Sequence, residues 1–127
     1  DAFFMNEDRH TNNIAVIYNE KTQKYELSPF FDQGLCMFAD INQDYPIDQS
    51  LEYCLEKIEA KPFSSDFDIQ LDAAEELYGI QIGFQFTFKD IQIYLQKNSE
   101  NYPREVIRRV EQLLRRQMRK YGYLMKK

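Results

Sequence analysis

The spacing of hydrophobic residues changes once along this chain, and that change limits the folds it can adopt. In the first part they form two short runs, Ile14–Tyr18 and Tyr25–Leu27, joined by the polar segment 19–24. Two β-rich runs separated by a polar turn predict a β-hairpin. The first run is continuously apolar, so we expect it to be a buried strand. From Ile47 onwards, apolar residues recur every three or four positions, which is typical of amphipathic helices.

Four helical segments are predicted after the hairpin from start and stop signals. Ser, Thr and Asp side chains accept hydrogen bonds from the free N–H groups of a first turn, glycine ends helices, and proline is tolerated in a first turn. The signals predict one helix that begins at Ile47 and ends before Pro62, helices over 67–78 and 88–97, and a last helix beginning near Asn101. Ser65 or Asp66 would cap the helix over 67–78, and Gly79 would end it. Thr87 would cap the helix over 88–97, and Pro103 would lie in the first turn of the last helix.

The predicted order is loop, hairpin, short loop and about four helices, which describes an α+β fold that is mostly α. The 127 residues suit a single domain or lobe, and a hydrophobic content of 43% supports a buried core. No apolar run approaches the roughly 18–20 residues of a membrane span, so no membrane partner is expected. Cys36 and Cys54 have neither metal-ligand spacing nor a disulfide framework, which favours a cytoplasmic setting.

Charge is distributed unevenly along the chain. Residues 101–127 contain nine Lys/Arg and two Asp/Glu, whereas residues 1–100 contain seven and nineteen. Such a basic segment can bind nucleic acid or an anionic membrane. We expect instead that it is the solvated face of a helix, and direct nucleic-acid binding is not predicted. The apolar stripe of that helix, predicted to be core, comprises Val106, Ile107, Val110, Leu113, Leu114, Met118 and Tyr121.

Asp8, Asn13 and Asp32 form the pattern that is most informative about function. Asp8 and Asn13 lie five residues apart in a loop before the first strand, and Asp32 follows the second strand, two residues before Gly34. A hairpin returns the chain to its starting point, so Asp32 is expected near Asn13. Their amide oxygen and carboxylate suit Mg²⁺, which also takes waters and substrate phosphates. Asp8 would stay free to orient and deprotonate an attacking hydroxyl, as phosphoryl transfer requires.

The order Asp-x-x-x-x-Asn, hairpin, Asp-x-Gly resembles the catalytic loop and metal-binding motif of protein kinases. The segment 8–14, Asp-Arg-His-Thr-Asn-Asn-Ile, is similar to the phosphatidylinositol 3/4-kinase-like group and to the HipA-like serine/threonine kinases, which are toxins of bacterial toxin–antitoxin pairs. The segment 27–32, Leu-Ser-Pro-Phe-Phe-Asp, favours the HipA-like group, because lipid kinases usually carry His-Ile-Asp-Phe-Gly at this point. The resemblance covers roughly residues 3–34.

The HipA-like resemblance implies a role for each of these residues. Asp8 would be the catalytic base, His10 the organiser of the catalytic loop, and Asn13 and Asp32 the ligands of Mg²⁺ and thereby of ATP. Arg9 would pair with an acidic or phosphorylated group nearby. The resemblance also implies a kinase-like carboxy-terminal lobe over residues 1–127, in which 1–34 carry the catalytic loop, hairpin and metal Asp and 47–127 form the helical part.

The activity implied by the resemblance is transfer of the ATP γ-phosphoryl group to a Ser or Thr hydroxyl of a protein substrate. By analogy, an antitoxin-type protein would be a further partner. The chain contains no Gly-x-Gly-x-x-Gly, no Walker A sequence and no Val-Ala-Ile-Lys-like strand. In such kinases these parts belong to an amino-terminal lobe, so we expect that lobe to be a partner and this chain alone to have little turnover. Two alternatives stay open: a lipid or small-molecule kinase of the same superfamily, and a non-catalytic kinase-like interaction module.

Overall fold

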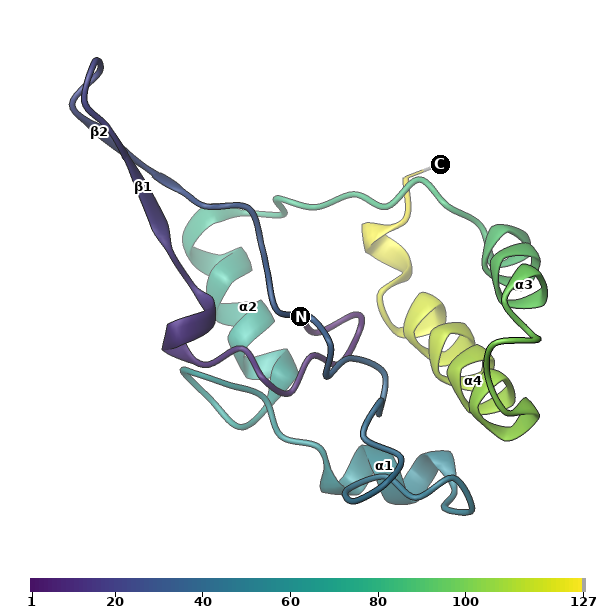
Figure 1. Ribbon diagram of the computed structural model, residues 1–127. Coiled ribbons are helices and arrows are strands. Elements are labelled where there is room, and N and C mark those ends of the chain that lie inside the picture. The colour runs from purple at the N-terminus through teal and green to yellow at the C-terminus, as the bar shows by residue number, and fades with distance from the viewer. Residues whose placement is uncertain (127) are drawn as a thin grey trace.

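The hairpin and four helices follow one another in the order that the hydrophobic pattern predicts. The computed structural model describes residues 1–126. It is a small α+β fold that is mostly helical, as expected (Figure 1). The elements are the short 3-10 helix η1 (Thr11–Asn13), β1 (Val16–Asn19), β2 (Lys24–Leu27), α1 (Leu51–Lys57), α2 (Phe67–Tyr78), α3 (Phe88–Lys97), α4 (Arg104–Lys120) and the 3-10 helix η2 (Gly122–Leu124).

The hairpin projects from the body, so the prediction of a buried first strand is wrong (Figure 1). The two strands pair antiparallel, with Val16 opposite Leu27, and the Ser28 N–H donates to the Ala15 carbonyl at 2.9 Å. Val16 and Ile17 are 62% and 52% exposed. A continuous apolar run is buried only where a second layer covers the sheet, and a two-stranded hairpin has no such layer of its own.

The caps predicted for α2 and α3 are confirmed. The Asp66 carboxylate accepts from the N–H groups of Asp68 and Ile69 at 2.8 and 3.1 Å. Gly79 closes α2 with φ 72°, a left-handed conformation that glycine adopts without a Cβ clash. Thr87 and Asp90 cap α3 reciprocally, each side chain accepting from the backbone N–H of the other. Local side-chain chemistry is therefore sufficient to define these helix ends.

The first and last helices begin later than predicted. α1 starts at Leu51 rather than Ile47, because the Ser50 hydroxyl accepts from the Tyr53 N–H at 3.1 Å and caps the helix there. The preceding residues form a turn instead, in which the Gln49 N–H donates to the Pro46 carbonyl at 3.0 Å. Pro103 immediately precedes α4 rather than lying within its first turn.

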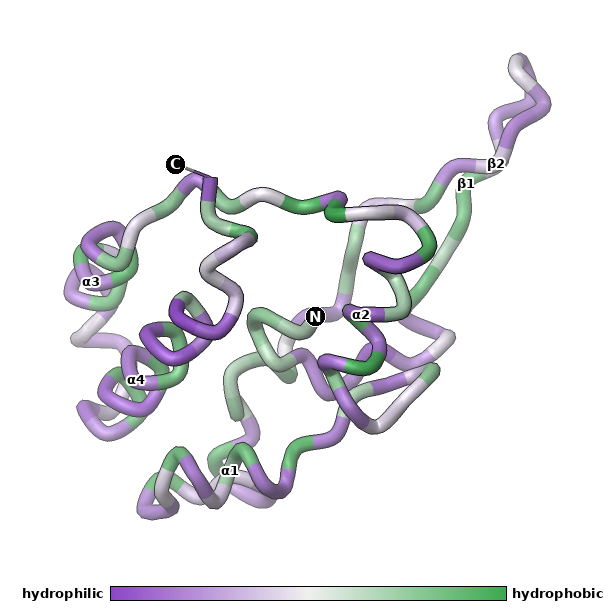
Figure 2. Tube along the Cα trace, turned by 180° about the vertical axis from the view of Figure 1, so that it is seen from behind, coloured by the Kyte–Doolittle hydropathy of each residue, from purple (hydrophilic) through white to green (hydrophobic). Residues whose placement is uncertain are grey.

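The core forms around α4, whose hydrophobic and hydrophilic residues alternate along its turns (Figure 2). Leu113 belongs to a cluster with Phe38, Cys54 and Phe67, while Leu114 belongs to a second cluster with Ile91 and Phe3. The prediction that the α4 stripe is core is confirmed for Leu113, Leu114 and Tyr121, which are buried. Both cysteines are free thiols, Cys54 buried and Cys36 half-buried.

Two polar residues of α4 are also buried, which the prediction of a solvated basic face missed. Arg109 donates to the carbonyls of Pro46, Tyr45 and Phe38 at 2.8, 2.9 and 3.3 Å. Gln117 donates to the carbonyls of Ala2 and Phe3 at 2.9 and 3.1 Å. The carbonyls belong to segments outside helices and sheets, so no backbone N–H of a regular element donates to them. The side chains of Arg109 and Gln117 supply the donors instead.

The carboxy-terminal residues close the body by pairing with the extended connection between α2 and α3. Phe84 donates its N–H to the Leu124 carbonyl at 2.8 Å and accepts from the Lys126 N–H at 2.8 Å. Among residues 1–126, no helix combines the length and the apolar character that crossing a membrane would need.

Candidate functional site

Asp8, His10 and Asn13 lie together in the loop that leads into β1. The 3-10 turn η1 folds the loop back, so that the Asn13 side-chain Nδ2 donates to the Asp8 carbonyl at 2.8 Å. The same nitrogen lies 3.2 Å from His10 Nε2, which in turn lies 3.7 Å from Asp8 Oδ2. The imidazole therefore contacts both the carboxylate proposed as base and the amide proposed as metal ligand, a position consistent with a role in organising the loop.

The Asn13 side chain leaves its oxygen available. Its NH₂ group is engaged with the Asp8 carbonyl, and no hydrogen bond to Oδ1 is found within residues 1–126. No fully buried side-chain oxygen or nitrogen in that range lacks a partner, so Oδ1 must reach solvent although Asn13 as a whole is buried. An amide oxygen is a ligand type that a hard cation accepts.

Arg9 connects this loop to the exit of the hairpin. Its Nη1 donates to the carbonyls of Asn13 and Phe31 at 3.0 and 3.1 Å. Its Nε lies 3.1 Å from the Asp1 carboxylate, which is the acidic partner expected for Arg9. The guanidinium lies 5.1 Å from the Phe30 ring centroid and is buried. Because one nitrogen binds both carbonyls, the segments that contain Asn13 and Asp32 lie side by side.

Asp32 follows the anchored Phe31 directly, but its carboxylate is not joined to Asn13. It is exposed and makes no hydrogen bond or ion pair with any residue in 1–126. Its φ is 54°, in the left-handed region, which Asp tolerates better than most residues. The structure thus places Asp32 beside the loop with its oxygens free.

Asn13 and Asp32 carry an amide oxygen and a carboxylate, which are ligand types that Mg²⁺ accepts. Within residues 1–126, no three His, Cys, Asp or Glu side chains gather as a metal site. Mg²⁺ does not need such a cluster, because it usually keeps several waters and takes one or two protein oxygens together with substrate phosphates. Asn13 and Asp32 would supply the protein oxygens.

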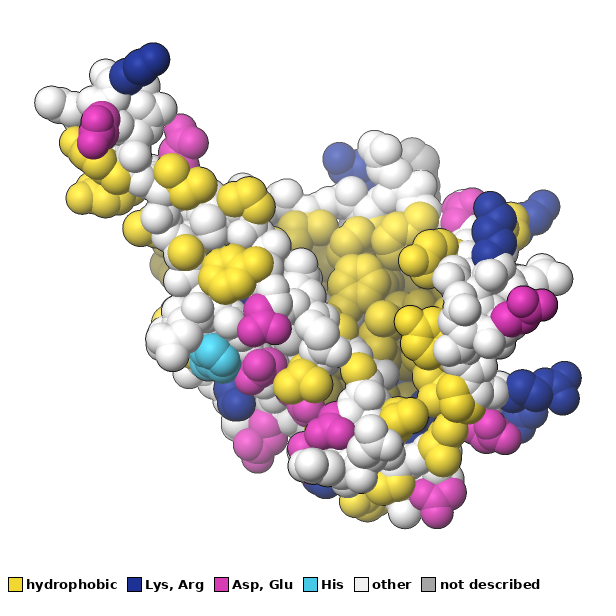
Figure 3. Space-filling view, in the orientation of Figure 1, with side chains coloured by type: hydrophobic (Ala, Val, Ile, Leu, Met, Phe, Trp, Pro, Cys, Tyr) yellow, Lys and Arg dark blue, Asp and Glu magenta, His cyan; other side chains and the backbone are white. Residues whose placement is uncertain are grey.

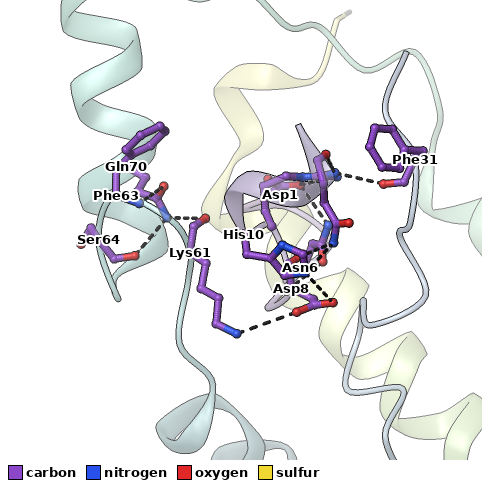
Figure 4. A network of polar contacts seen from close by, with 11 residues as sticks. Asp1, Asn6, Asp8, His10, Phe31, Lys61, Phe63, Ser64 and Gln70 are labelled. Atoms are coloured by element: carbon purple, nitrogen blue, oxygen red, sulfur yellow. Dashed lines mark hydrogen bonds and ion pairs between the residues drawn. The ribbon is translucent and has the colours of Figure 1, made fainter. Parts of the chain in front are cut away.

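Two residues near Asp8 were not predicted from the sequence. Lys61 lies in the connection between α1 and α2, with Nζ 3.8 Å from Asp8 Oδ1 (Figure 4). Glu7 accepts a hydrogen bond from the Tyr45 hydroxyl. Burial raises the pKa of Glu7 and the nearby Asp44 and Asp40 add to this, while the Tyr45 hydrogen bond opposes it. Neither contact has a local sequence signal, because each joins segments far apart in the chain.

An apolar hollow begins immediately after Asp32. One cavity of about 420 Å³ lies between the loop at Gln33–Ile41 and helices α3 and α4. A second cavity, of about 350 Å³, adjoins it and is also bordered by Phe4 and Phe86. Both are lined by Met37, Tyr94, Leu95 and Val110, and Figure 3 shows hydrophobic side chains across this hollowed face.

Comparison of the chain with protein-family models, with curated protein sequences and with solved structures found no match.

Proposed function

We propose that this chain is the carboxy-terminal catalytic part of an ATP- and Mg²⁺-dependent kinase of the HipA-like type. The observation that carries the proposal is the Arg9 bridge, which holds the Asp8–Asn13 loop beside the segment ending in Asp32. The base, the amide oxygen and the metal carboxylate of a phosphoryl-transfer site come from these two segments.

In the proposed reaction, Asp8 orients a Ser or Thr hydroxyl of a protein substrate and accepts its proton. The hydroxyl oxygen forms a bond to the γ-phosphorus of ATP while the bond from that phosphorus to the β,γ-bridging oxygen breaks. The electron pair of the broken bond leaves with ADP. Asn13 and Asp32 would hold Mg²⁺, which when bound neutralises charge on the phosphates. His10, in contact with Asp8 and Asn13, keeps the loop in position.

The proposed enzyme needs further parts that residues 1–127 do not contain. An amino-terminal lobe would supply the adenine pocket and the phosphate-pairing lysine, and this chain alone would turn over little. By analogy with HipA-like kinases, the protein would act in the cytoplasm beside an antitoxin-type partner.

The test is transfer of labelled phosphate from ATP by the protein that contains this chain together with its amino-terminal lobe, with Mg²⁺ and with EDTA. We expect metal-dependent label on protein, and a loss of several orders of magnitude in rate for Asp32→Ala. Asp48→Ala, which removes an exposed carboxylate with no hydrogen bond or ion pair within residues 1–126, should leave the rate unchanged. Equal label in the Asp32→Ala and Asp48→Ala variants would disprove the site.

A lipid or small-molecule acceptor is the second candidate, favoured by the apolar hollow. The hollow is lined mainly by apolar side chains and starts at Gln33, next to the proposed metal carboxylate. An apolar acceptor could bind there with its hydroxyl directed towards Asp8. In the same assay, label in extracted lipid rather than in protein would support this acceptor class. No nucleotide binding at all would instead support a non-catalytic interaction module.

A further inference from the structure

Lys61 and His10 flank the Asp8 carboxylate on its two different oxygens. Lys61 Nζ lies 3.8 Å from Oδ1, while His10 Nε2 lies 3.7 Å from Oδ2. Figure 4 shows the Lys61 side chain directed from its own loop towards Asp8, on the far side from Phe31. The lysine is thus part of the surroundings of the proposed base, although it comes from a different part of the chain.

The backbone that carries Lys61 is fixed by a single side chain of α2. Gln70 Nε2 donates to the carbonyls of Lys61 and Ser64, at 3.1 Å each, and Gln70 Oε1 accepts from the Phe63 N–H at 3.4 Å. The Ala60 N–H donates to the Ser65 carbonyl at 2.8 Å and closes the base of the loop. These bonds define where the lysine side chain starts, and only the side chain itself stays free to move.

The ammonium group of Lys61 keeps its donors available. At 3.8 Å, its contact with Asp8 is longer than a hydrogen bond, and Nζ has no hydrogen-bond acceptor within residues 1–126. The side chain is 53% exposed, so it is open to a ligand. An exposed ion pair of this length contributes little to stability.

We propose that Lys61 is a further catalytic residue, whose ammonium group binds an oxygen of the transferred phosphoryl group. This inference rests on the proposed kinase function. A hydroxyl bonded to Asp8 and about 3–3.5 Å from the γ-phosphorus places the phosphoryl oxygens a few ångströms from the carboxylate. That region lies within reach of an ammonium group 3.8 Å from Oδ1. Lys61 forms no covalent bond and keeps its protons throughout, acting as a point charge that stabilises the anionic group.

The test measures two affinities of this chain separately. Binding of inorganic triphosphate with Mg²⁺ is followed by ³¹P NMR, and binding of Mn²⁺ alone by electron paramagnetic resonance. Lys61→Ala and Lys61→Met should weaken triphosphate binding about tenfold or more, as expected for loss of a charged hydrogen bond, while Lys61→Arg retains most of the affinity. Lys97→Ala, which removes an exposed lysine of α3 that has no hydrogen bond or ion pair within residues 1–126, should have no effect. All four variants should bind Mn²⁺ like the unmodified chain, and Asp32→Ala should not.

The outcomes separate this inference from the function on which it rests. Mn²⁺ binding that is lost in Asp32→Ala, with equal triphosphate affinity in the unmodified chain and in Lys61→Met, would overturn the role of Lys61 alone. Triphosphate that does not bind the unmodified chain would also count against Lys61. Mn²⁺ binding that does not depend on Asp32 would overturn the metal site and the kinase proposal with it. Lys61→Met keeps the length and apolar stem of the side chain, so it provides a result even where Lys61→Ala folds poorly.

Discussion

Arg9 shows how a single buried side chain can assemble a candidate site from two loops. Its guanidinium binds the Asn13 and Phe31 carbonyls and the Asp1 carboxylate at the same time. A lysine ammonium has the same charge, but it lacks the planar fork that reaches three acceptors in different directions. The position therefore requires the geometry of arginine as well as its positive charge.

The first residue-scale prediction is that Arg9→Lys separates the loop from the hairpin exit. We expect a loss of about 2–3 kcal/mol in the free energy of unfolding, because buried carbonyls are left without donors. Mn²⁺ affinity should fall as well, since Asp32 is no longer held beside Asn13. Urea unfolding and Mn²⁺ titration measure the two effects. Arg108→Lys, at an exposed arginine of α4, is the control, and an equal result for both variants would contradict the structural role of Arg9.

The second residue-scale prediction concerns the pH dependence introduced by Glu7. Burial raises the pKa of this carboxyl in the folded protein, so the folded state binds the proton more tightly than the unfolded state does. The resulting stability is present at low pH and is lost as pH rises through the ordinary glutamate range towards the folded-state pKa. Glu7→Gln keeps an acceptor for the Tyr45 hydroxyl without the charge, so it should be more stable than the unmodified protein at pH 7.

The Glu7→Gln advantage should shrink as the pH is lowered to about 4, near the ordinary pKa of glutamate. Urea unfolding at both pH values measures it. Glu59→Gln, at an exposed glutamate, controls for the change in net charge. An advantage that is the same at pH 7 and pH 4 would mean that Glu7 titrates alike in the folded and unfolded states.

At the scale of elements, local interactions allowed α2 and α3 to be predicted, although the equally local Ser50 cap that starts α1 was missed. α2 and α3 have the predicted bounds, because Asp66, Thr87 and Gly79 act on backbone groups within a few residues of themselves. The Asp8–Asn13 contact, which was not predicted, is also local, because η1 is a turn within one loop. A cap or a turn depends only on the residues beside it, so a short window of sequence contains the needed information.

The sequence did not predict burial or side-chain contacts that depend on segments distant in the chain. The apolar run at Ile14–Tyr18 has the composition of a buried strand, but in the structure no layer covers the hairpin. Lys61 reaches Asp8 only because α1 and α2 bring their connection to the loop before β1. Arg109 lies among charged residues in the sequence, yet the helix turns it inward. Each of these features is decided by tertiary arrangement, which hydrophobic period and turn signals do not encode.

At the scale of the whole molecule, α4 holds segments that have little regular structure of their own. Residues 1–5 and 38–46 contain neither helix nor strand, yet Phe3, Met5, Phe38 and Tyr45 are core residues. Apolar burial draws these segments inward, and it also takes their carbonyls away from water. Gln117 and Arg109 supply donors to those carbonyls, which explains two polar side chains on the inner face of an otherwise apolar stripe.

The whole-molecule prediction is that Arg109→Met destabilises the protein although methionine is apolar and similar in length. Three carbonyls, of Pro46, Tyr45 and Phe38, would lose their donor in a buried site, and we expect a loss of about 3 kcal/mol or more in the free energy of unfolding. Hydrogen exchange should quicken at the Tyr45 amide, whose bond to the Asp40 carbonyl lies within the same loop. Arg119→Met is the matched control, because Arg119 is an exposed arginine of the same helix. Equal stability of the two variants would mean that apolar packing of Phe38 and Tyr45 alone fixes the loop. A selective loss in Arg109→Met would mean that hydrogen bonds from α4 determine the path of the chain between the proposed metal carboxylate and the helical body.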